Sequence, residues 1–526
     1  MTALLITLFL PLIGAILLLL AGNNTKIIKY TALGVSVVTF IVSLFLYFSF
    51  DQANPEFQFV FESVWITQFD AGFRIGIDGM SLLLVLLTTL ISPIAILSSF
   101  DAIKKREKEY YFMVLILQFA MTGVFVALDL FLFYIFWEII LIPMYFIIGI
   151  WGGKNRIYAA VKFFIFTAVG SLFMLVAIVW VAHYAGTYIT NHPGGFTSNY
   201  LVLRDITKMI PLDIQNWLFW AFALSFFIKV PLFPVHTWLP DAHTDAPTPG
   251  SVILASILLK MGTYGLIRFN LELFPVASIE FSSIISALAV IGIIYGALVA
   301  MIQTDFKRLV AYTSVSHLGF VVLGIFSMTL NGIQGAIIQM VNHGLSTGLL
   351  FLCVGFLYER RHTRLISEYG GVAKVMPHFS VIFGIAMFAS IGLPGLNGFI
   401  GEFLTLQGAM QSKILNNPWF TVFGTSGVIL AAVYLLWMYQ RVMYGTIDNP
   451  QNLQLKDLKT SEYIMTIPLI IFIVWIGVYP NTFLNISDVS AKKTVNKIEM
   501  IKFNRQPYEL PTMNNKIDNN NLENSK

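Results

Sequence analysis

The stretch Trp217-Leu-Phe-Trp-Ala-Phe-Ala-Leu-Ser-Phe-Phe-Ile-Lys229 ends an apolar run with a lysine, and Pro231 and Pro234 follow almost at once. Three other charged side chains also lie inside long apolar stretches: Glu138, Lys260 and Glu402. A charge at the centre of a bilayer costs about 2.5–3.5 kcal/mol on insertion scales, so such residues usually face a bundle interior or a wet cavity. Because intramembrane ionisable groups usually carry ions or protons, the pattern predicts a protein that conducts charge or protons.

The composition excludes a soluble globular domain. Hydrophobic residues make up 57% of the 526 residues and charged residues only 11%, whereas ordinary domains contain about 25% charged residues. Many apolar windows reach the length of about 20 residues that a helix needs to cross the hydrocarbon core. We therefore predict an all-α polytopic membrane protein. Its single cysteine, Cys353, leaves no disulfide framework and no cysteine-based metal site.

Fourteen transmembrane helices are expected. They lie near residues 2–21, 30–50, 78–99, 111–128, 130–151, 161–185, 215–231, 250–269, 281–302, 309–328, 332–357, 379–410, 418–440 and 463–484. Lys and Arg cluster in alternate loops, so the positive-inside bias places these loops in the cytoplasm and both termini on the outer side. Residues 488–526 are rich in Asn and poor in apolar residues, which predicts a disordered tail.

Polar positions within the spans form a weak twofold pattern. The two sets are Glu138, Lys162 and Lys229, and then His317, His343 and Glu402. The gaps are 24 and 67 residues in the first set and 26 and 59 in the second. The sets begin on spans five and ten, an odd offset that predicts two inverted repeats of five helices.

This pattern gives an expected domain organisation along the chain. The expected parts are residues 1–110 with three N-terminal helices, 111–270 as the first repeat, 281–440 as the second, 463–487 as the last helix and 488–526 as a polar tail. Helices seven and twelve are expected to be broken, at Pro231 and Pro234 and at Gly392-Leu-Pro394-Gly395. Broken backbone at membrane depth is tolerated where protein or water satisfies the freed groups, which indicates a polar path through the centre.

The buried charges are the candidate site residues. Glu138 and Lys229 are expected to form an ion pair that takes up and releases protons; the alternative is a salt bridge that only locks two helices. Lys260 lies ten residues into its span, too deep to reach the surface easily, and a neutral lysine bonded to water is expected there. Glu402 is similarly deep, and a polar anchor between helices is the alternative for both residues.

Histidines supply further candidates. His317 and His343 are interpreted as relay groups because histidine titrates near neutral pH, the alternative being satisfied interior side chains. Four more polar residues crowd one predicted loop: His236, Asp241, His243 and Asp245. Their spacing does not follow the usual zinc pattern, and it favours a cap near a proton mouth over a metal site. No nucleotide, flavin, haem or iron–sulfur motif is present in the sequence, so no cofactor is expected in this chain.

Several motifs together resemble the antiporter-like subunits of respiratory complex I. They are Ile77-Asp-Gly-Met-Ser81, Phe136-Trp-Glu138, Lys229-Val-Pro-Leu-Phe-Pro-Val-His-Thr-Trp-Leu-Pro-Asp-Ala-His243, the span with Lys260, and Tyr312-Thr-Ser-Val-Ser-His317. The resemblance covers nearly the whole chain except the tail. Two features resemble the M-type branch of the family. One is glutamate at 402, where most of the family has lysine. The other is the set of fourteen spans without a long lateral C-terminal helix.

The resemblance carries roles onto individual residues. Glu138 and Lys229 resemble the ion pair of the family, Lys260 its central lysine and Glu402 its terminal proton site. His317 and His343 match its central polar axis. The implied function is proton translocation within NADH:quinone oxidoreductase of a bacterial cytoplasmic membrane, coupled to quinone reduction elsewhere in the complex.

The same resemblance implies partners and leaves alternatives open. Flavin, iron–sulfur clusters and quinone are expected in partner subunits. Expected contacts are other complex I membrane subunits, especially neighbouring antiporter-like ones, and lipid, with no nucleic acid. Related subunits occur in multisubunit sodium/proton antiporters and membrane-bound hydrogenases, which remain alternatives. A membrane scaffold that conducts nothing is a third.

Overall fold

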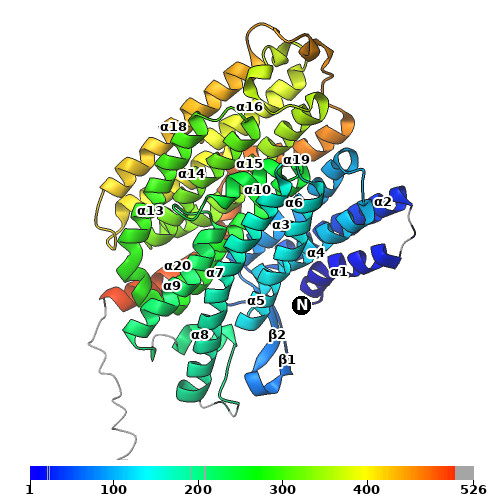
Figure 1. The fold of residues 1–526 in the computed structure, drawn as a ribbon. Helices are drawn as coiled ribbons and strands as arrows, with labels where there is room; N and C mark the ends of the chain where they lie inside the picture. Colours follow the sequence, from blue (N-terminus) through cyan, green and yellow to red (C-terminus); the bar gives the residue numbers. More distant parts are fainter. Residues whose placement is uncertain (21, 23, 191, 193, 207–208, 504–526) are drawn as a thin grey trace, which may run out of the picture.

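The computed structural model describes residues 1–20, 22, 24–190, 192, 194–206 and 209–503, and it is a bundle of long helices with one small hairpin (Figure 1). Within these residues, twelve segments are long and apolar enough to cross a membrane. They are α1 (Thr2–Leu20), α2 (Thr25–Ser49), α3 (Gly79–Ala102), α4 (Glu107–Val126), α5 and α6 (Leu130–Ile139, Leu141–Trp151), α7 (Arg156–Tyr184, prolonged to Ile189), α11 and α12 (Thr248–Ile253, Leu259–Gly265, within Thr248–Leu271), α13 (Pro275–Met301), α14 (Phe306–Ser327), α15 (Leu330–Arg361), α18 (Trp419–Met443) and α19 (Thr460–Val478). The expected all-α polytopic membrane protein is confirmed.

Spans seven and twelve are broken, as expected. The first consists of α9 (Leu212–Lys229) and α10 (Trp238–Asp245), and the second of α16 (Pro377–Ile391) and α17 (Asn397–Gln411). Together with the twelve continuous segments they account for the fourteen expected spans. The inverted symmetry of the two sets of five helices, and the domain limits based on it, stay predictions.

The break after Lys229 is closed by side-chain and backbone hydrogen bonds. The amide of Leu232 turns back to the carbonyl of Phe227 at 2.9 Å, so the carbonyl of Ile228 loses its normal helical donor. The indole Nε1 of Trp238 donates to that carbonyl at 2.8 Å. A buried polar backbone group is thereby satisfied without continuing the helix.

The break between α16 and α17 uses glycine and paired amides. Gly392 and Gly395 have φ values of +82° and +92°, a left-handed conformation that glycine adopts without strain. Asn342 on α15 donates to the carbonyl of Asn397 at 2.7 Å, and Asn397 donates to the carbonyl of Asn342 at 3.2 Å. This reciprocal contact fixes the start of α17 against α15.

The loop expected over residues 51–77 contains an antiparallel hairpin. Strands β1 (Gln58–Ile66) and β2 (Ala71–Ile77) pair with Glu62 opposite Arg74. Arg74 contacts the carboxylates of Glu62 at 2.5 Å, Asp70 at 2.6 Å and Asp129 at 3.0 Å. Asp129 comes from the start of α5, so this cluster joins the hairpin to the bundle.

The expectation for the C-terminal segment was wrong in part. Residues 463–487 were expected to form one helix followed by a disordered tail, but α19 ends at Val478 and α20 spans Asn481–Phe503. Ile486, Ala491, Val495 and Ile498 are buried, so the helix docks through an apolar stripe although its composition is polar. Residues 504–526 lie outside the described part of the chain.

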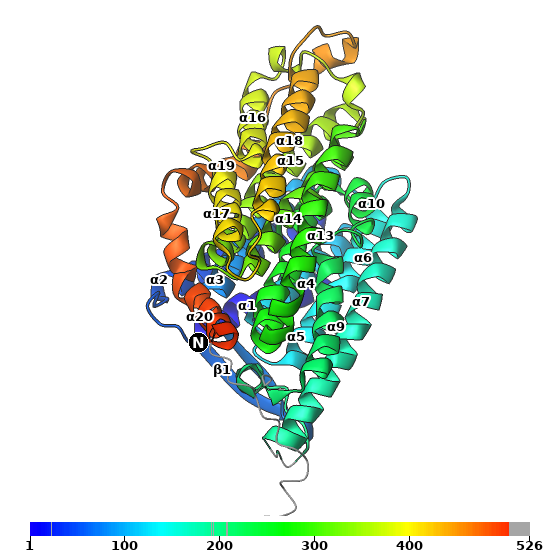
Figure 2. The ribbon, with the colours of Figure 1, turned by 90° about the vertical axis from the view of Figure 1, so that its left-hand side faces the viewer.

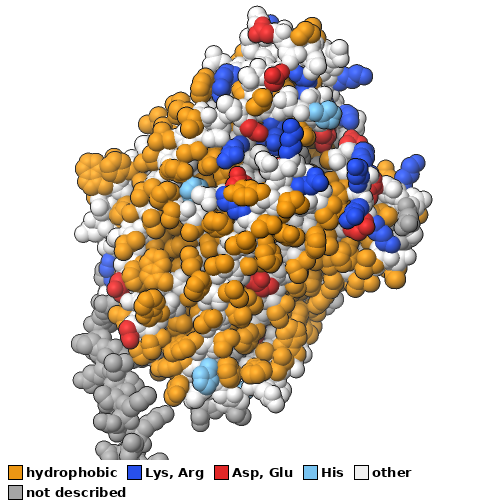
Figure 3. All heavy atoms as spheres, viewed as in Figure 1, with side chains coloured by type: hydrophobic (Ala, Val, Ile, Leu, Met, Phe, Trp, Pro, Cys, Tyr) orange, Lys and Arg blue, Asp and Glu red, His pale blue; other side chains and the backbone are white. Residues whose placement is uncertain are grey.

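The central helices of the bundle are the most buried. The most apolar windows of the α11–α12 segment and of α15 are 100% buried and that of α14 is 94%, whereas those of α2 and α18 are only 28% buried. Figure 2 shows α14 and α15 among the surrounding helices, and Figure 3 shows hydrophobic side chains over most of the face in view, with charged side chains gathered toward its upper end. The inner helices are therefore the place for a polar site, since buried polar groups of a membrane protein face the interior of the bundle.

Smaller elements complete the description. Among the fully described segments they are α8 (Tyr200–Ile206) and short 3-10 turns at Thr67–Phe69, Ile366–Glu368, Val372–Lys374 and Pro450–Gln454. The hairpin, α8 and α20 lie at one end of the bundle, and the loops that follow α15 and α18 lie at the other (Figure 1). We call these the hairpin end and the basic end; the second carries Arg360, Arg361 and Arg364.

Candidate functional site

Lys260 contacts His343 directly. The ammonium Nζ of Lys260 lies 2.6 Å from Nδ1 of His343 and also donates to the carbonyl of Ala255. Both side chains are buried, and Lys260 is 0% exposed. Two of its partners are therefore protein groups, and the expected bond to water stays a prediction.

The local helix geometry explains how Lys260 reaches these partners. The backbone is π-helical over Leu254–Leu258, between α11 and α12. Such a bulge widens the helix, rotates the residues beyond it and is frequent at functional sites. It brings the Ala255 carbonyl to Lys260, five residues later. Gly262 then lets α12 approach α9, because an added Cβ would lie 2.7 Å from the Phe226 carbonyl oxygen.

Glu402 contacts His317. Its Oε1 atom lies 2.7 Å from Nδ1 of His317 and accepts a hydrogen bond from the amide of Gln339 at 3.2 Å. Both the carboxylate and the imidazole are buried. The break before α17 places Glu402 one turn into that helix, facing α14 and α15 rather than lipid.

The two pairs meet at the two histidines. The rings of His317 and His343 are 6.0 Å apart between centroids. Within the described residues, Nε2 of each ring is buried without a hydrogen-bond partner. Four of the six predicted site residues therefore form one row: Lys260, His343, His317 and Glu402.

The hydrogen-bond partners limit the tautomers that each charge state of the row allows. When Lys260 carries its charge it has donors only, so Nδ1 of His343 accepts and the ring proton is on Nε2. When the Glu402 carboxylate is ionised it only accepts, so Nδ1 of His317 carries a proton and Nε2 is free to accept. The two unpartnered nitrogens are thus a donor and an acceptor, the combination that one bridging water can join.

The expected ion pair of Glu138 and Lys229 is not formed in the described structure. Nζ of Lys229 and Oε1 of Glu138 are both buried without a hydrogen-bond partner there. Lys229 instead lies 5.1 Å from the ring centroid of Trp137 and 5.6 Å from that of Phe163. The two charges remain close enough to interact electrostatically. Cation–π attraction to these two rings partly replaces the direct pair.

The four polar residues after the first break were expected in a loop. They lie instead on α10 or just before it. Asp241 pairs with Lys162 at 2.7 Å, and the carboxylate of Asp245 accepts from the amide of Asn155 at 3.0 Å. His243 stacks on Phe351 with centroids 4.7 Å apart. No group of three or more His, Cys, Asp or Glu in the described residues could hold a metal ion.

A polar cleft opens at the basic end. It has a volume of about 420 Å³ and is lined by Asp101, Asp245, Lys307, Glu359 and Lys459, among others. Lys307 is itself buried and donates to the carbonyl of Ala246. Asp245 and Lys307 therefore link this cleft to the segment between α10 and α11 that leads to Lys260.

Sequence reasoning missed the amides that hold the row. Gln339 bonds Glu402, and Asn342 joins Gln339 to the start of α17. Gln339 and Asn342 lie on the 32-residue α15, four residues and one residue before His343. The signal was the sequence Gln339-Met-Val-Asn342-His343, a polar stripe at helical spacing in a fully buried helix.

Fold and site together define a class: a polytopic helical protein with an antiporter-like row of buried ionisable groups. The family described as NADH:quinone oxidoreductase/Mrp antiporter, transmembrane, matches residues 127–431. The family described as NADH-ubiquinone oxidoreductase chain 4, amino terminus, matches residues 5–123. The chain belongs to this family of NADH:quinone oxidoreductase and antiporter membrane subunits.

Similar proteins narrow the position within the family. NADH-quinone oxidoreductase subunit M of Rickettsia bellii is 44% identical over 498 residues, which are 94% of this chain and 98% of that protein. Subunit M of Rhodobacter capsulatus is 46% identical over 495 residues, 90% of this chain and 92% of that protein. The M-type resemblance noted in the sequence is confirmed.

Solved structures support the same fold. A chain of respiratory complex I from Thermus thermophilus with bound NADH superposes with a TM-score of 0.84 at 30% identity, covering 94% of this chain and 99% of that chain. A chain of the Mrp complex from Dietzia has a TM-score of 0.81 at 18% identity, covering 94% and 98%, which shows a shared fold alone. The protein is a multi-pass membrane subunit of a multisubunit NADH-quinone oxidoreductase.

Proposed function

We propose that this chain moves protons across the membrane along the row from Lys260 to Glu402. The observation that carries the proposal is the pair of contacts at 2.6 and 2.7 Å that end in two facing histidines. Proton transfer needs hydrogen-bonded steps of this length. Redox chemistry belongs to partner subunits that hold flavin, iron–sulfur clusters and quinone, and this chain holds no redox centre.

The tautomers define the direction of each step. Lys260 gives a proton to Nδ1 of His343, which releases its Nε2 proton toward Nε2 of His317. His317 then releases its Nδ1 proton to the Glu402 carboxylate, so one proton has moved and both imidazoles have exchanged tautomers. A single water between the two Nε2 atoms completes the path. Each imidazole must return to its first tautomer before the next proton can be transferred, so the row transfers one proton at a time.

Lys229 and Glu138 supply the control of the first step. A charge on Lys229 raises the free energy of a second charge on Lys260, because α9 and α12 pack together where Gly262 meets Val230. Movement of Glu138 toward Lys229 stabilises the Lys229 charge and thereby favours proton loss from Lys260. Glu138 and Lys229 are not in direct contact in the described structure, so this movement would strengthen their interaction.

The proposal also covers location and partners. The basic end faces the cytoplasm of a bacterial cell and the hairpin end faces the outer side, following the positive-inside rule. The N-terminus and the end of α20 then lie on the outer side, since α1 begins and α20 ends at the hairpin end. Neighbouring antiporter-like subunits and lipid cover the hydrophobic outer face.

The decisive experiment is Glu402→Gln in the intact complex. Glutamine keeps the shape of the side chain but cannot titrate. We expect NADH-driven acidification of the vesicle lumen to fall to a small fraction of the wild-type extent in inverted membrane vesicles. Glu280→Gln, an exposed substitution on α13, is the matched control and should pump normally.

Wild-type acidification by Glu402→Gln would reduce this glutamate to an anchor between helices. A gradient of sodium ions instead of protons, measured with a sodium-selective dye in the same vesicles, would assign the row to sodium exchange. Assembly of both variants is checked on a native gel.

A further inference from the structure

A second buried cation lies on the same transmembrane segment as Lys260. Arg268 is eight residues later, toward the hairpin end, in the π-helical stretch Leu266–Leu271, and it is 2% exposed. The row described above does not use it. Arginine stays protonated in proteins, so this position carries a permanent positive charge between Lys260 and the hairpin end.

Arg268 is held by anionic and hydroxyl groups. Its guanidinium donates to Asp78 at 2.6 Å and to the hydroxyl of Tyr264 at 3.2 Å, and it lies 3.6 Å from a carboxylate oxygen of Glu272. Asp78 is at the N-cap of α3, where it also accepts from the amide of Ser81. The charge is therefore paired across two spans that are far apart in the sequence.

Aromatic rings surround the same guanidinium. Its carbon lies 4.8 Å from the ring centroid of Phe57, 5.3 Å from that of Tyr264 and 6.0 Å from that of Tyr200. Rings at cation–π distance stabilise the charge. The neighbouring cavity has a volume of about 10 Å³, which is room for about one water molecule.

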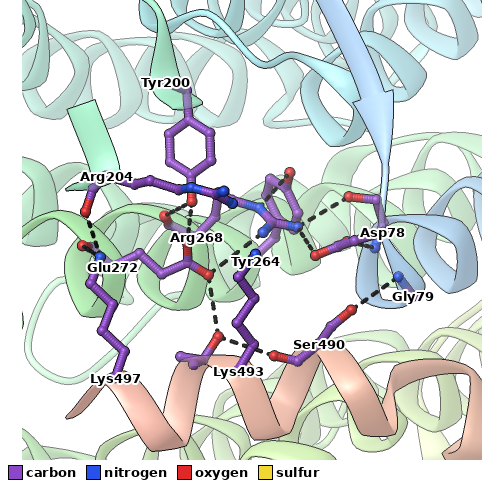
Figure 4. A network of polar contacts seen from close by, with 12 residues as sticks. Asp78, Gly79, Tyr200, Arg204, Tyr264, Arg268, Glu272, Ser490, Lys493 and Lys497 are labelled. Atoms are coloured by element: carbon purple, nitrogen blue, oxygen red, sulfur yellow. Dashed lines mark hydrogen bonds and ion pairs between the residues drawn. The ribbon is translucent and has the colours of Figure 1, made fainter. Parts of the chain in front are cut away.

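Helix α20 closes the site from the hairpin end (Figure 4). Ser490 accepts from the amide of Gly79 at 3.2 Å, and Thr494 donates to Glu272 at 3.2 Å. Lys497 donates to the carbonyl of Glu272 at 2.9 Å. Gly79 is required here, because an added Cβ would lie 1.8 Å from the carbonyl oxygen of Ile486.

We infer that the Arg268–Asp78 pair, clamped by α20, is an electrostatic barrier that stops protons from passing between Lys260 and the hairpin end. The guanidinium, locked to Asp78, has room for about one water beside it, and a fixed arginine charge disfavours a second positive charge there, as in water channels that exclude protons. A proton on Lys260 then leaves through His343, along the row, instead of returning or escaping directly. The inference rests on the proposed function of the row and assigns Arg268 the role of preventing its short circuit.

The test measures passive proton flow without turnover. The purified complex is reconstituted into liposomes, a potassium diffusion potential is set with valinomycin, and proton influx is followed with an internal pH dye in the absence of NADH. The variant is Arg268→Gln combined with Asp78→Asn, which replaces the ion pair by a neutral hydrogen-bonded pair. We expect proton influx to rise about tenfold, the factor for a barrier lowered by about 1.4 kcal/mol.

Two matched variants separate a barrier from a structural anchor. Arg360→Gln with Glu462→Gln removes another largely buried arginine–carboxylate pair, at the basic end, where Arg360 contacts both oxygens of Glu462 at 2.7 and 2.6 Å. It should leave proton influx at the wild-type level. Adding Lys260→Met to the Arg268→Gln and Asp78→Asn pair should abolish the extra influx, because the leak passes through Lys260.

Unchanged influx in an assembled Arg268→Gln, Asp78→Asn complex would overturn the barrier. If that variant does not assemble, Thr494→Val with Lys497→Met loosens the α20 clamp without altering Arg268, and an influx equal to wild type would overturn the inference as well. The outcome is independent of the Glu402→Gln result, which is read from NADH-driven pumping. If the Arg268→Gln, Asp78→Asn complex leaks protons while the Glu402→Gln complex pumps normally, the barrier is supported and the proposed row is rejected.

Discussion

Lys260 and His343 are 83 residues apart in the sequence, yet the lysine Nζ lies 2.6 Å from Nδ1 of the histidine at the centre of the bundle. The contact joins the α11–α12 segment to α15, the two segments whose most apolar windows are completely buried. Of the two partners of Lys260 in the described residues, a carbonyl and an imidazole, only the imidazole can accept its proton. In the proposed path the pair therefore sets the direction in which a proton leaves Lys260.

The first prediction treats this pair as one unit. Lys260→Met and His343→Leu should each remove most proton pumping, and the double variant should lose no more than the worse single variant, because both steps belong to one transfer. The measurement is NADH-driven acidification in vesicles, normalised to quinone reduction. Losses that multiply in the double variant would show that the residues act separately.

The second prediction concerns the chemistry at position 402. Glu402→Lys should keep a measurable part of the pumping, in contrast to Glu402→Gln. A lysine there can donate to Nδ1 of His317 as Lys260 donates to His343, and it can titrate. The rates of acidification of both variants are compared in one vesicle preparation. Equal loss in the two would mean that a carboxylate, rather than any titratable group, is required.

The third prediction concerns Lys229 and Glu138. Lys229→Met should strongly impair pumping while the complex assembles normally, because the ammonium has no hydrogen-bond partner in the described chain that would be left unsatisfied. Glu138→Gln should have the same effect through the lost charge. A native gel reports assembly and a pH dye reports pumping. Normal coupled turnover in either variant would return both residues to a structural role.

The fourth prediction concerns pH and α20. The hydrogen bond from Lys493 is the largest cause that holds the pKa of Glu56 below its ordinary value of 4.5, and Arg204 adds to it. A lowered pKa contributes stability that is present above the ordinary value and is lost as the pH falls through the lowered one. The docking of α20 should therefore weaken as the pH drops below about 4.5.

A spin label on a cysteine introduced at Glu499, an exposed position of α20, reads this docking. Its mobility should increase on acidification in the wild-type background. Glu56→Gln should show increased mobility already at neutral pH and little further change. Mobility that is independent of pH in the wild-type background would contradict the assigned role of Glu56.

Much of the fold could be predicted because each span must bury about 20 apolar residues and each charge within it stands out. The breaks at Pro231 and Pro394 were readable for the same reason. The hairpin β1–β2 and helix α20 were not, since short amphipathic segments outside the bilayer are stabilised by docking. Arg74 with Asp129, and Thr494 with Glu272, are contacts between segments far apart in the sequence.

The candidate site, like the fold, could be predicted from the sequence only in part. The six residues Glu138, Lys229, Lys260, His317, His343 and Glu402 could be named from the sequence, because apolar surroundings make an ionisable group conspicuous. Their pairing could not. The sequence favoured Glu138 with Lys229, but the rings of Trp137 and Phe163 occupy the space around the lysine.

The sequence by itself determined which groups can carry charge and how deep in the membrane they lie, because burial cost depends on composition alone. Only the tertiary structure decided the order of the row. The π-helical turn at Leu254–Leu258 brings Lys260 to His343, the glycine-rich break brings Glu402 to His317, and α15 holds both pairs within reach. Proton transfer depends on distances of about 3 Å, and such distances are set by how helices pack.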